Sequence, residues 1–396
     1  MSLFVYKAKK GIDEFLDGQI EASTKQEALS KVDSLGLFLI SIEEKKLFSK
    51  NPDKVYLKEI LEFTNQLSVL MNSGSTLVNS LNTLIIETEQ PRLNPLIINI
   101  VSGVKEGNSF SQTLKNYPKI FSELYVSLVE VGETSGTLGE NLMRIGEFLE
   151  EELDFKTNLV SIATYPLLIL TVGFLTVLVL LKFVIPKLVD IFQEIEQTLP
   201  VSTACLVYIS GIFSKYWYVF IGLMVLFVFG IKKYFQNAKN KLKWDRHKLS
   251  ITVIGGVLKK IEIGRLARTL AILLKNGVSI SRALVILEFT TPNLIFRQAI
   301  CEIKGQINEG ASLNSAMKNT GVFPMGFINA VTVGEDSGIL GEVLESLSLS
   351  YKKDIDRKIK NLMTILEPLL IIGLGLIIGF VVLSMLLPIF KIDFNF

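Results

Sequence analysis

Residues 131–140 read VGETSGTLGE, and residues 333–342 repeat this stretch as VGEDSGILGE. The two copies lie 333 − 131 = 202 residues apart. Each copy is followed by an amphipathic stretch and then by a long apolar run. The sequence therefore predicts a polar helical module that leads into a membrane span, present twice in one polypeptide. This arrangement is typical of a membrane-anchored scaffold rather than of an enzyme.

The duplication extends beyond this stretch. The apolar stripe that begins at Phe63 recurs at Leu266, an offset of 266 − 63 = 203, and Gly74, where the first helix should stop, corresponds to Gly277. The offset falls from 203 to 202 after Leu114, which indicates a one-residue deletion in a loop. A register kept over this length indicates a tandem domain rather than a solenoid. Other matched positions are Leu67, Leu70 and Met71 with Leu270, Leu273 and Leu274, and Ile97, Ile100 and Val104 with Ile300, Ile303 and Ile307.

Composition agrees with polar domains joined to a few spans. Hydrophobic residues make up 49% of the 396 residues and charged residues 20%, and the mean hydropathy is +0.43. The net charge of +2 gives no reason to expect a nucleic-acid partner. Cys205 and Cys301 fall in different segments, which argues against a disulfide framework and a thiolate metal site. The N-terminus lacks the layout of a cleaved signal, so we expect the spans to direct insertion.

Residues 1–48 are predicted to form a small cytoplasmic ββαβ extension. Stretches beginning at Phe4 and Phe15 have strand composition, a short amphipathic helix follows, and Leu37 to Ile42 has the pattern of a closing strand. A unit this short buries little core, so we expect that it either docks on another surface or is only marginally stable alone. The charged segment from Lys45 to Lys58 is interpreted as a linker.

The fold class that follows is mainly α: a polytopic membrane protein with two duplicated cytoplasmic helical bundles and three transmembrane helices. In each copy the last amphipathic helix shows no stop before its span, so bundle and span should be mechanically coupled, with Pro166 or Pro368 as a candidate kink. The predicted segments are a first bundle at 58–163, spans at 164–186, 216–231 and 365–390, an outer periplasmic loop with a surface helix at 187–215, and a second bundle at 262–364.

Basic residues set the predicted orientation. They gather after the second span and before the third, whereas the loop between the first two spans has one Lys against Asp190, Glu194 and Glu196. The bundles and the N-terminus are therefore predicted in the cytoplasm, and the loop and the C-terminus in the periplasm. These cations either bind anionic lipid or serve only as topology determinants. They are Lys232, Lys233, Lys239, Lys241, Lys243, Arg246 and Lys248, and Lys352, Lys353, Arg357, Lys358 and Lys360.

The span interiors carry almost no ionisable residue, which argues against a solute pathway. Lys182 lies near the end of the first span, where its ammonium can reach the surface. Gly375 and Gly379 in the third span form a GxxxG pattern. This pattern either permits close helix approach or reflects glycine that a membrane helix tolerates.

Little in the sequence indicates catalysis, and we assign no catalytic, cofactor-binding or metal-binding residue. No Gly-Lys dipeptide occurs, so there is no P-loop, and His247 is the only histidine. Glu133 and Glu335, in the repeated stretch, either bind a cation or a basic partner, or cap or bridge helices beside a glycine turn. We favour the structural role, because ion-pair networks mimic functional sites. The acidic run from Glu150 to Asp154 is interpreted as a solvated helix face.

These motifs resemble the F-type inner-membrane platform proteins of type II secretion systems and type IV pilus machines. The repeated stretch is similar to the VGE-x-SG-x-L signature of that family, and the resemblance covers essentially the whole chain. Further matches are Tyr165-Pro166 and Val184-Ile185-Pro186 at the first span, Leu199-Pro200 with Thr203 in the outer loop, Glu367-Pro368 and Leu387-Pro388-Ile389-Phe390 at the third span, and Phe4 to Ala8 with Gly18 and Ala28 in the extension.

The resemblance implies two cytoplasmic six-helix-like bundles with three spans and no catalysis by this chain. It implies an inner-membrane scaffold of a type II secretion system, which couples a cytoplasmic assembly ATPase to pseudopilin polymerisation and protein secretion. The expected partners are that ATPase, other inner-membrane components, pilin or pseudopilin subunits, membrane lipid and further copies of the chain. The alternatives are the platform of a type IV pilus machine, a small permease or channel subunit, and an unrecognised cytosolic enzyme.

Overall fold

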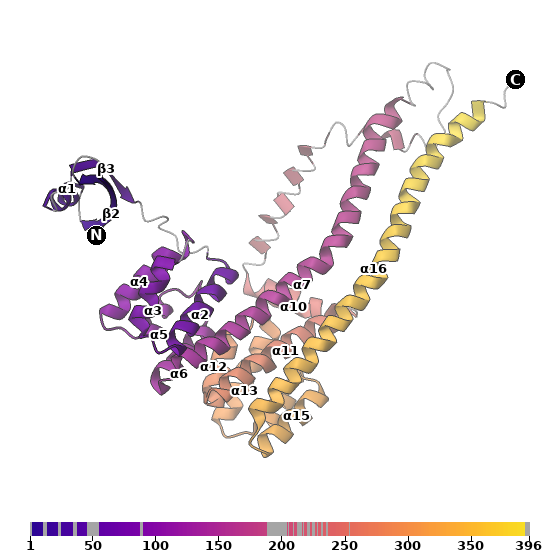
Figure 1. Cartoon of the computed structure of the whole chain (residues 1–396). Coiled ribbons are helices and arrows are strands. Elements are labelled where there is room, and N and C mark those ends of the chain that lie inside the picture. Colours follow the sequence, from indigo (N-terminus) through magenta and orange to yellow (C-terminus); the bar gives the residue numbers. More distant parts are fainter. Residues whose placement is uncertain are drawn as a thin grey trace. The chain divides into compact units, whose positions relative to one another are not determined.

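The fold of the chain is mainly helical, as the sequence predicts (Figure 1). The computed structural model describes residues 2–10, 14–22, 25–34, 38–45, 55–87, 90–187, 237–252 and 254–392, with scattered residues between 204 and 234. Packing divides the chain into two compact units, Met1–Glu150 and Glu151–Phe396.

The first unit begins with a three-stranded antiparallel sheet in the order β2-β1-β3. In β1, Phe4 pairs with Ile20 of β2 and with Glu44 of β3, and the register with β3 shifts between Lys7 and Ala8. A short helix connects β2 to β3. The elements are β1 (Ser2–Lys10), β2 (Glu14–Ala22), α1 (Lys25–Ser34) and β3 (Phe38–Lys45).

Short helices follow in the first unit and enclose a leucine- and isoleucine-rich core. Phe63 and Leu67 of the predicted stripe are buried, whereas Leu70 and Met71 are partly exposed at its edge. Ile97 and Ile100 are fully buried. The helices are α2 (Leu57–Asn72), α3 (Leu77–Glu87), α4 (Leu93–Lys105), α5 (Phe110–Lys115), α6 (Glu123–Ser135) and the start of α7 (Leu138–Val179).

The second unit contains the rest of α7 and a second set of helices. Leu266, Leu270 and Leu273 are buried at the positions that match the stripe of the first copy. The elements are the π-helical turn η2 (Leu180–Val184), α10 (Ala238–Ser250), α11 (Ile254–Lys275), α12 (Ile280–Thr290), α13 (Leu294–Asn308), α14 (Leu313–Thr320), α15 (Met325–Asp336) and α16 (Leu340–Ile392).

Helix ends confirm that the two sets are copies. Gly74 follows α2 with φ +88°, and Gly277 follows α11 with φ +79°. Gly136 and Gly338 also have positive φ, +74° and +69°, just before α7 and α16. A left-handed residue ends a helix with least strain when it is glycine. The helix stops that the sequence places at Gly74 and Gly277 are therefore confirmed.

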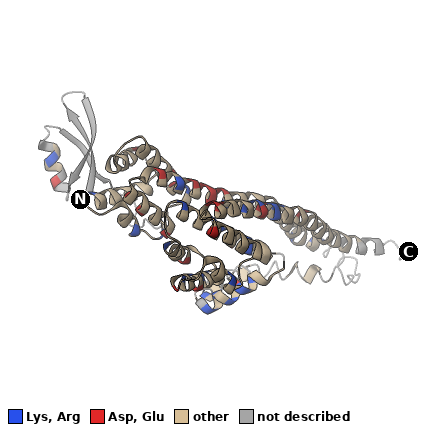
Figure 2. Ribbon diagram, turned by 90° about the horizontal axis from the view of Figure 1, so that it is seen from below, with Lys and Arg blue, Asp and Glu red and all other residues tan. Residues whose placement is uncertain are grey.

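Two helices are long and apolar enough to cross a membrane. The helix at Leu138–Lys187 contains an 18-residue window of mean hydropathy 2.7, and the helix at Leu340–Ser384 one of 2.6. Both continue from a charged half into an apolar half without a break, and α7 passes through Pro166 (Figure 2). The predicted absence of a stop before each span is confirmed. The span predicted at 216–231 and the outer loop at 187–215 lie mostly outside the described residues.

One buried polar pair distinguishes the two cores. The Tyr125 hydroxyl and Thr64 Oγ1 lie 3.0 Å apart, and Thr64 Oγ1 donates to the Ile60 carbonyl at 2.7 Å, so the phenol donates to Thr64. Burial raises the pKa of Tyr125 well above its ordinary value. The matching positions of the second copy are Ala267 and Phe327, which are also buried. An apolar pair therefore fills the same place in the second copy.

This difference predicts the outcome of a double-mutant cycle. Thr64→Ala removes the acceptor of a buried phenol and should lower the free energy of unfolding by about 1–3 kcal/mol. Adding Tyr125→Phe should recover most of that loss, because no unpaired hydroxyl remains. Thermal unfolding of the detergent-solubilised protein measures both. A double variant as unstable as Thr64→Ala alone would contradict the explanation.

Candidate force-transmitting site

Glu133, near the end of α6, caps the start of a neighbouring helix. Its carboxylate accepts hydrogen bonds from the Phe110 N–H at 2.6 Å and the Ser111 N–H at 2.9 Å. Both donors belong to the first turn of α5, where backbone N–H groups have no partner within their own helix. A negative charge is favoured at this end of a helix. Glu133 thus joins α6 to α5 through two charge-assisted hydrogen bonds.

Glu335 repeats this geometry in the second unit. Its carboxylate, on α15, accepts from the Leu313 N–H at 2.9 Å and the Asn314 N–H at 3.2 Å, at the start of α14. Both carboxylates of the repeated stretch therefore have the structural role that the sequence favours. Glu133 belongs to the first unit and Glu335 to the second.

The glycines of the repeated stretch allow close helix approach. A Cβ on Gly132 would lie 2.9 Å from Leu138 Cα, and a Cβ on Gly334 would lie 3.1 Å from Leu340 Cα. In both copies the helix that carries the glutamate therefore packs directly on the first residue of the long helix. The glycine thus allows α6 and α15 to approach the starts of α7 and α16, while the glutamate beside it caps α5 or α14.

Gly139, the second residue of α7, also allows a close approach between helices. Its carbonyl accepts a hydrogen bond from Ser68 Oγ at 2.9 Å, and a Cβ at this position would lie 2.2 Å from Asn72 Oδ1. In the second copy, a Cβ on Gly341 would lie 3.0 Å from Lys275 Cγ. The first turn of each long helix is thus held against the first helix of its own bundle.

In the second unit, Arg268 of α11 links both long helices. Its Nε and Nη2 lie 3.0 Å and 3.1 Å from the two carboxylate oxygens of Glu151 on α7. Its Nη1 lies 3.4 Å from Glu345 Oε1 on α16, and Lys275 Nζ lies 2.7 Å from the other Glu345 oxygen. Lys275 and Arg268 lower the pKa of Glu345 from its ordinary value. We call this cluster of Glu151, Arg268, Lys275 and Glu345 the junction.

The junction corrects one prediction and adds a residue that the sequence does not indicate. Glu150 and Asp154 are exposed, as a solvated face requires, but Glu151 is ion-paired with Arg268. Glu152 also has a partner, Lys156, at 2.7 Å. Arg268 is 18% exposed at its side chain and lies 117 positions from Glu151 in sequence, so no local pattern predicts the pair.

Apolar packing extends the junction along the same three helices. Ile355 and Ile359 of α16 and Val257 of α11 form a buried cluster. Phe155, Leu159 and Ile162 of α7 pack against it. Lys260 and Asp354 add an ion pair between α11 and α16. Within this unit, ion pairs and apolar contacts therefore both pack the polar half of α7 against α11 and α16.

The apolar halves of α7 and α16 also meet. A Cβ on Gly173 would lie 2.3 Å from Leu374 Cδ1. By contrast, a Cβ on Gly375 or Gly379 would have no atom within 4 Å, so the GxxxG pattern makes no close contact with the residues that the structure describes. The close approach occurs at a glycine of the first span instead.

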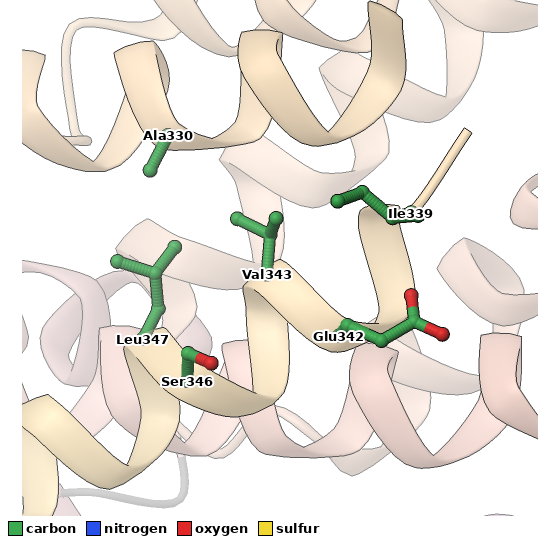
Figure 3. Close-up of a pocket in the computed structure, with 6 residues that line it drawn as sticks. All are labelled: Ala330, Ile339, Glu342, Val343, Ser346 and Leu347. Carbon is green, nitrogen blue, oxygen red and sulfur yellow. The ribbon is translucent and has the colours of Figure 1, made fainter. Parts of the chain in front are cut away.

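A groove on the second unit lies between α15 and α16 (Figure 3). It has a volume of about 400 Å³ and is open to solvent. Glu342 is the one charged residue that lines it, beside the apolar side chains of Ala330, Ile339, Val343 and Leu347 and the hydroxyl of Ser346. This lining offers no nucleophile–base pair.

Among the described residues, no group of three or more His, Cys, Asp and Glu side chains is arranged to hold a metal ion. His247 lies on α10, exposed, with its ring 6.4 Å from the ring of Trp244. Cys301 is a free, exposed thiol on α13. None of these groups lies in the junction.

The sequence matches the family described as "Type II secretion system (T2SS), protein F" over residues 63–186 and 266–388. Each match begins on the first helix of a bundle and ends at the apolar end of a long helix, so it covers both copies of the fold described above. The chain belongs to this family.

Relatives of this chain are named either as type IV pilus assembly proteins or as type II secretion system proteins. The type IV pilus assembly protein PilC of Myxococcus xanthus is 30% identical over 98% of this chain and 94% of its own length. PilC of Thermus thermophilus is 31% identical over 99% of this chain and 98% of its own length. The type II secretion system protein F of Vibrio cholerae is 26% identical over 99% of both chains. The family that the sequence motifs indicate is confirmed.

The two glutamate caps predict a matched pair of stability losses. Glu133→Ala and Glu335→Ala should each lower the free energy of unfolding by about 1–2 kcal/mol, because two N–H groups lose a charged acceptor. The controls are Glu106→Ala and Glu309→Ala, which remove an exposed glutamate at matching positions just after α4 and α13 and should not lower stability, because a negative charge is not favoured at the C-terminal end of a helix. Unfolding of the solubilised protein in denaturant measures all four. Equal losses for caps and controls would contradict the capping role.

Proposed function

We propose that this protein is a non-enzymatic platform of the cell inner membrane. In this role it couples a cytoplasmic assembly ATPase to the polymerisation of pilin or pseudopilin subunits. The observation that carries the proposal is that α7 and α16 each run from a helical bundle into an apolar segment as one uninterrupted helix. Such a helix suits the transfer of displacement better than the binding of a substrate.

The proposed topology has three spans, with the N-terminus and both bundles in the cytoplasm. The apolar halves of α7 and α16 supply the first and third spans, and residues 216–231 supply the second. The C-terminus and residues 187–215 then lie in the periplasm. The basic residues after the second span and before the third support this orientation.

The proposed mechanism is mechanical. Nucleotide-driven motion in the ATPase shifts the bundles, and the junction passes the displacement to α7 and α16 together. Because the Arg268 guanidinium binds both Glu151 and Glu345, the two long helices move as a pair in this scheme. Further copies of the chain and other inner-membrane components complete the machine.

The proposal has two versions: the platform belongs either to a type II secretion system or to a type IV pilus machine. The sequence motifs place a type II secretion system first. The identities do not separate the two versions, because relatives named as pilus assembly proteins are 30% and 31% identical and the type II secretion system protein F of Aeromonas hydrophila is 29% identical. A permease is disfavoured, because charged residues in the described parts of both spans lie near their ends, at Lys182, Lys187 and Glu367.

Affinity purification from mild detergent tests the proposal. We expect an assembly ATPase and other inner-membrane components of the machine to co-elute with the full-length protein. Recovery of pilins would select the pilus version, and recovery of pseudopilins the secretion version. Absence of any such partner, together with ion flux through vesicles that contain the protein alone, would contradict the platform role in favour of a channel.

A further inference from the structure

Helix α10 begins close to the apolar segment that precedes it in sequence. Asn237 caps α10 with extended backbone angles (φ −82°, ψ 120°), and its side chain accepts from the Lys239 N–H at 3.1 Å. Asn240 Nδ2 donates to the Tyr234 carbonyl at 3.3 Å. Three residues span at most about 11 Å, so Tyr234 and the start of α10 lie close together. The exposed apolar residues before this point include Tyr218, Leu223, Leu226, Phe227 and Phe229.

One face of α10 docks on the second bundle. The helix packs against α11 and α13. Leu242 and Leu249 on this face are partly buried, and Asp245 is 7% exposed. Asp245 Oδ2 accepts a hydrogen bond from the Leu294 N–H at 3.1 Å, at the first residue of α13. The single acidic residue of α10 therefore points inward and caps another helix.

The opposite face of α10 is mainly basic and carries no acidic residue; Asn240 and Ser250 are the uncharged polar residues on it. At about 100° per residue, Lys239, Lys243, Arg246 and His247 lie away from Asp245, and all four are exposed. None of them forms an ion pair with a described residue. Trp244 is 41% exposed beside them, and Lys248 Nζ lies 5.4 Å from its ring centroid. Figure 2 shows Lys and Arg gathered on this helix. We call these four residues and Trp244 the outer face of α10.

We infer that the outer face of α10 binds the anionic headgroups of the membrane surface. This inference rests on the proposed function, because it requires α10 to follow a span on the cytoplasmic side. Three observations favour lipid over a protein partner: the short distance from the apolar segment, the charge of one sign, and an exposed Trp, a residue typical of the membrane–water interface. The first copy has no helix equivalent to α10 among the described residues.

This contact has a mechanical consequence. Since Asp245 fastens α10 to the start of α13, a lipid-bound α10 holds the second bundle near the membrane. The first bundle has no such attachment through the described residues. Lipid binding by α10 would therefore restrain movement of the second bundle relative to the membrane. The first bundle would be the one that the ATPase displaces.

Fluorescence of Trp244 tests the inference on the full-length protein. Trp217→Phe leaves Trp244 as the only tryptophan. The protein is reconstituted in phosphatidylcholine vesicles with or without phosphatidylglycerol, each containing a lipid spin-labelled at the headgroup. We expect quenching of Trp244 to rise severalfold with phosphatidylglycerol. It should fall again at an ionic strength of about 1 M, where screening acts over about 3 Å.

A pair of double variants tests whether the lysines of α10 bind the lipid headgroups. The double variant Lys239→Gln, Lys243→Gln removes two cations from the outer face of α10. Each removal should weaken the headgroup interaction, read as the salt-sensitive part of the quenching, by about fivefold. The control, Lys105→Gln with Lys318→Gln, removes the same charge from exposed positions on α4 and α14 and should have no effect. Quenching that is independent of phosphatidylglycerol, or equal losses in both variants, would overturn the inference. So would a loss of ATPase co-purification in the α10 variant with its lipid quenching intact.

A thiol reaction separates failure of the inference from failure of the proposed function. Cys205→Ser leaves Cys301, exposed on α13, as the only cysteine. Protection of Cys301 from a membrane-impermeant maleimide in intact cells supports the cytoplasmic position of the second bundle. Labelling from outside would overturn the topology and the inference together. Protection of Cys301 without lipid-dependent quenching of Trp244 would overturn the inference alone.

Discussion

The continuity of α7 and α16 from a charged half into an apolar half is the constraint on which the rest of this structure depends. In an α-helix each N–H is bonded four residues back, so the helix resists bending along its length, except at a proline such as Pro166 or Pro368, which has no N–H to donate. Helix α7 continues for 42 residues and α16 for 53, which corresponds to roughly 60 Å and 80 Å. Each joins polar packing at one end to an apolar segment at the other. This continuity is what the proposed mechanism requires, since a displacement of the polar end must reach the apolar end.

The repeated stretch determines where these helices begin. Gly132 lets α6 lie against the first residue of α7, Glu133 ties α6 to α5, and Gly136 ends α6 in a left-handed turn. Gly139 then holds the first turn of α7 against α2. The second copy uses the same four positions for α15, α14, α16 and α11. The stretch thus joins neighbouring helices within each unit through backbone geometry and one carboxylate.

The sequence predicts much of this fold because its main signals are local. Glycine at Gly74 and Gly277 ends helices through backbone geometry, and apolar spacing from Phe63 and Leu266 marks the buried faces, so both features depend on residues close in the chain. The absence of a stop before Pro166 predicts the continuous α7 for the same reason. The structural alternative for Glu133 and Glu335 also follows from a carboxylate beside a glycine turn.

The features that the sequence does not indicate all join distant positions. Arg268 pairs with Glu151 and Glu345 across three helices, and Asp245 caps α13 from α10, so neither has a sequence signal. The acidic run near Glu151 looked uniformly solvated, because exposure on a helix depends on neighbours that are remote in sequence. The GxxxG pattern at Gly375 and Gly379 has two interpretations, and the described residues show no close approach there; Leu374 instead meets Gly173 of α7.

A hinge placed in α7 beyond the junction tests the mechanical claim most directly. The variant Leu153→Gly with Asp154→Gly lowers the helix propensity of this stretch by about 2 kcal/mol relative to the control variant Leu153→Ala with Asp154→Ala, which favours the helix. Piliation or secretion is measured in cells that carry either variant, with Cys301 protection as the check on insertion. The account predicts loss of assembly in the glycine variant and normal assembly in the alanine variant, with both inserted. Normal assembly in the glycine variant would contradict it.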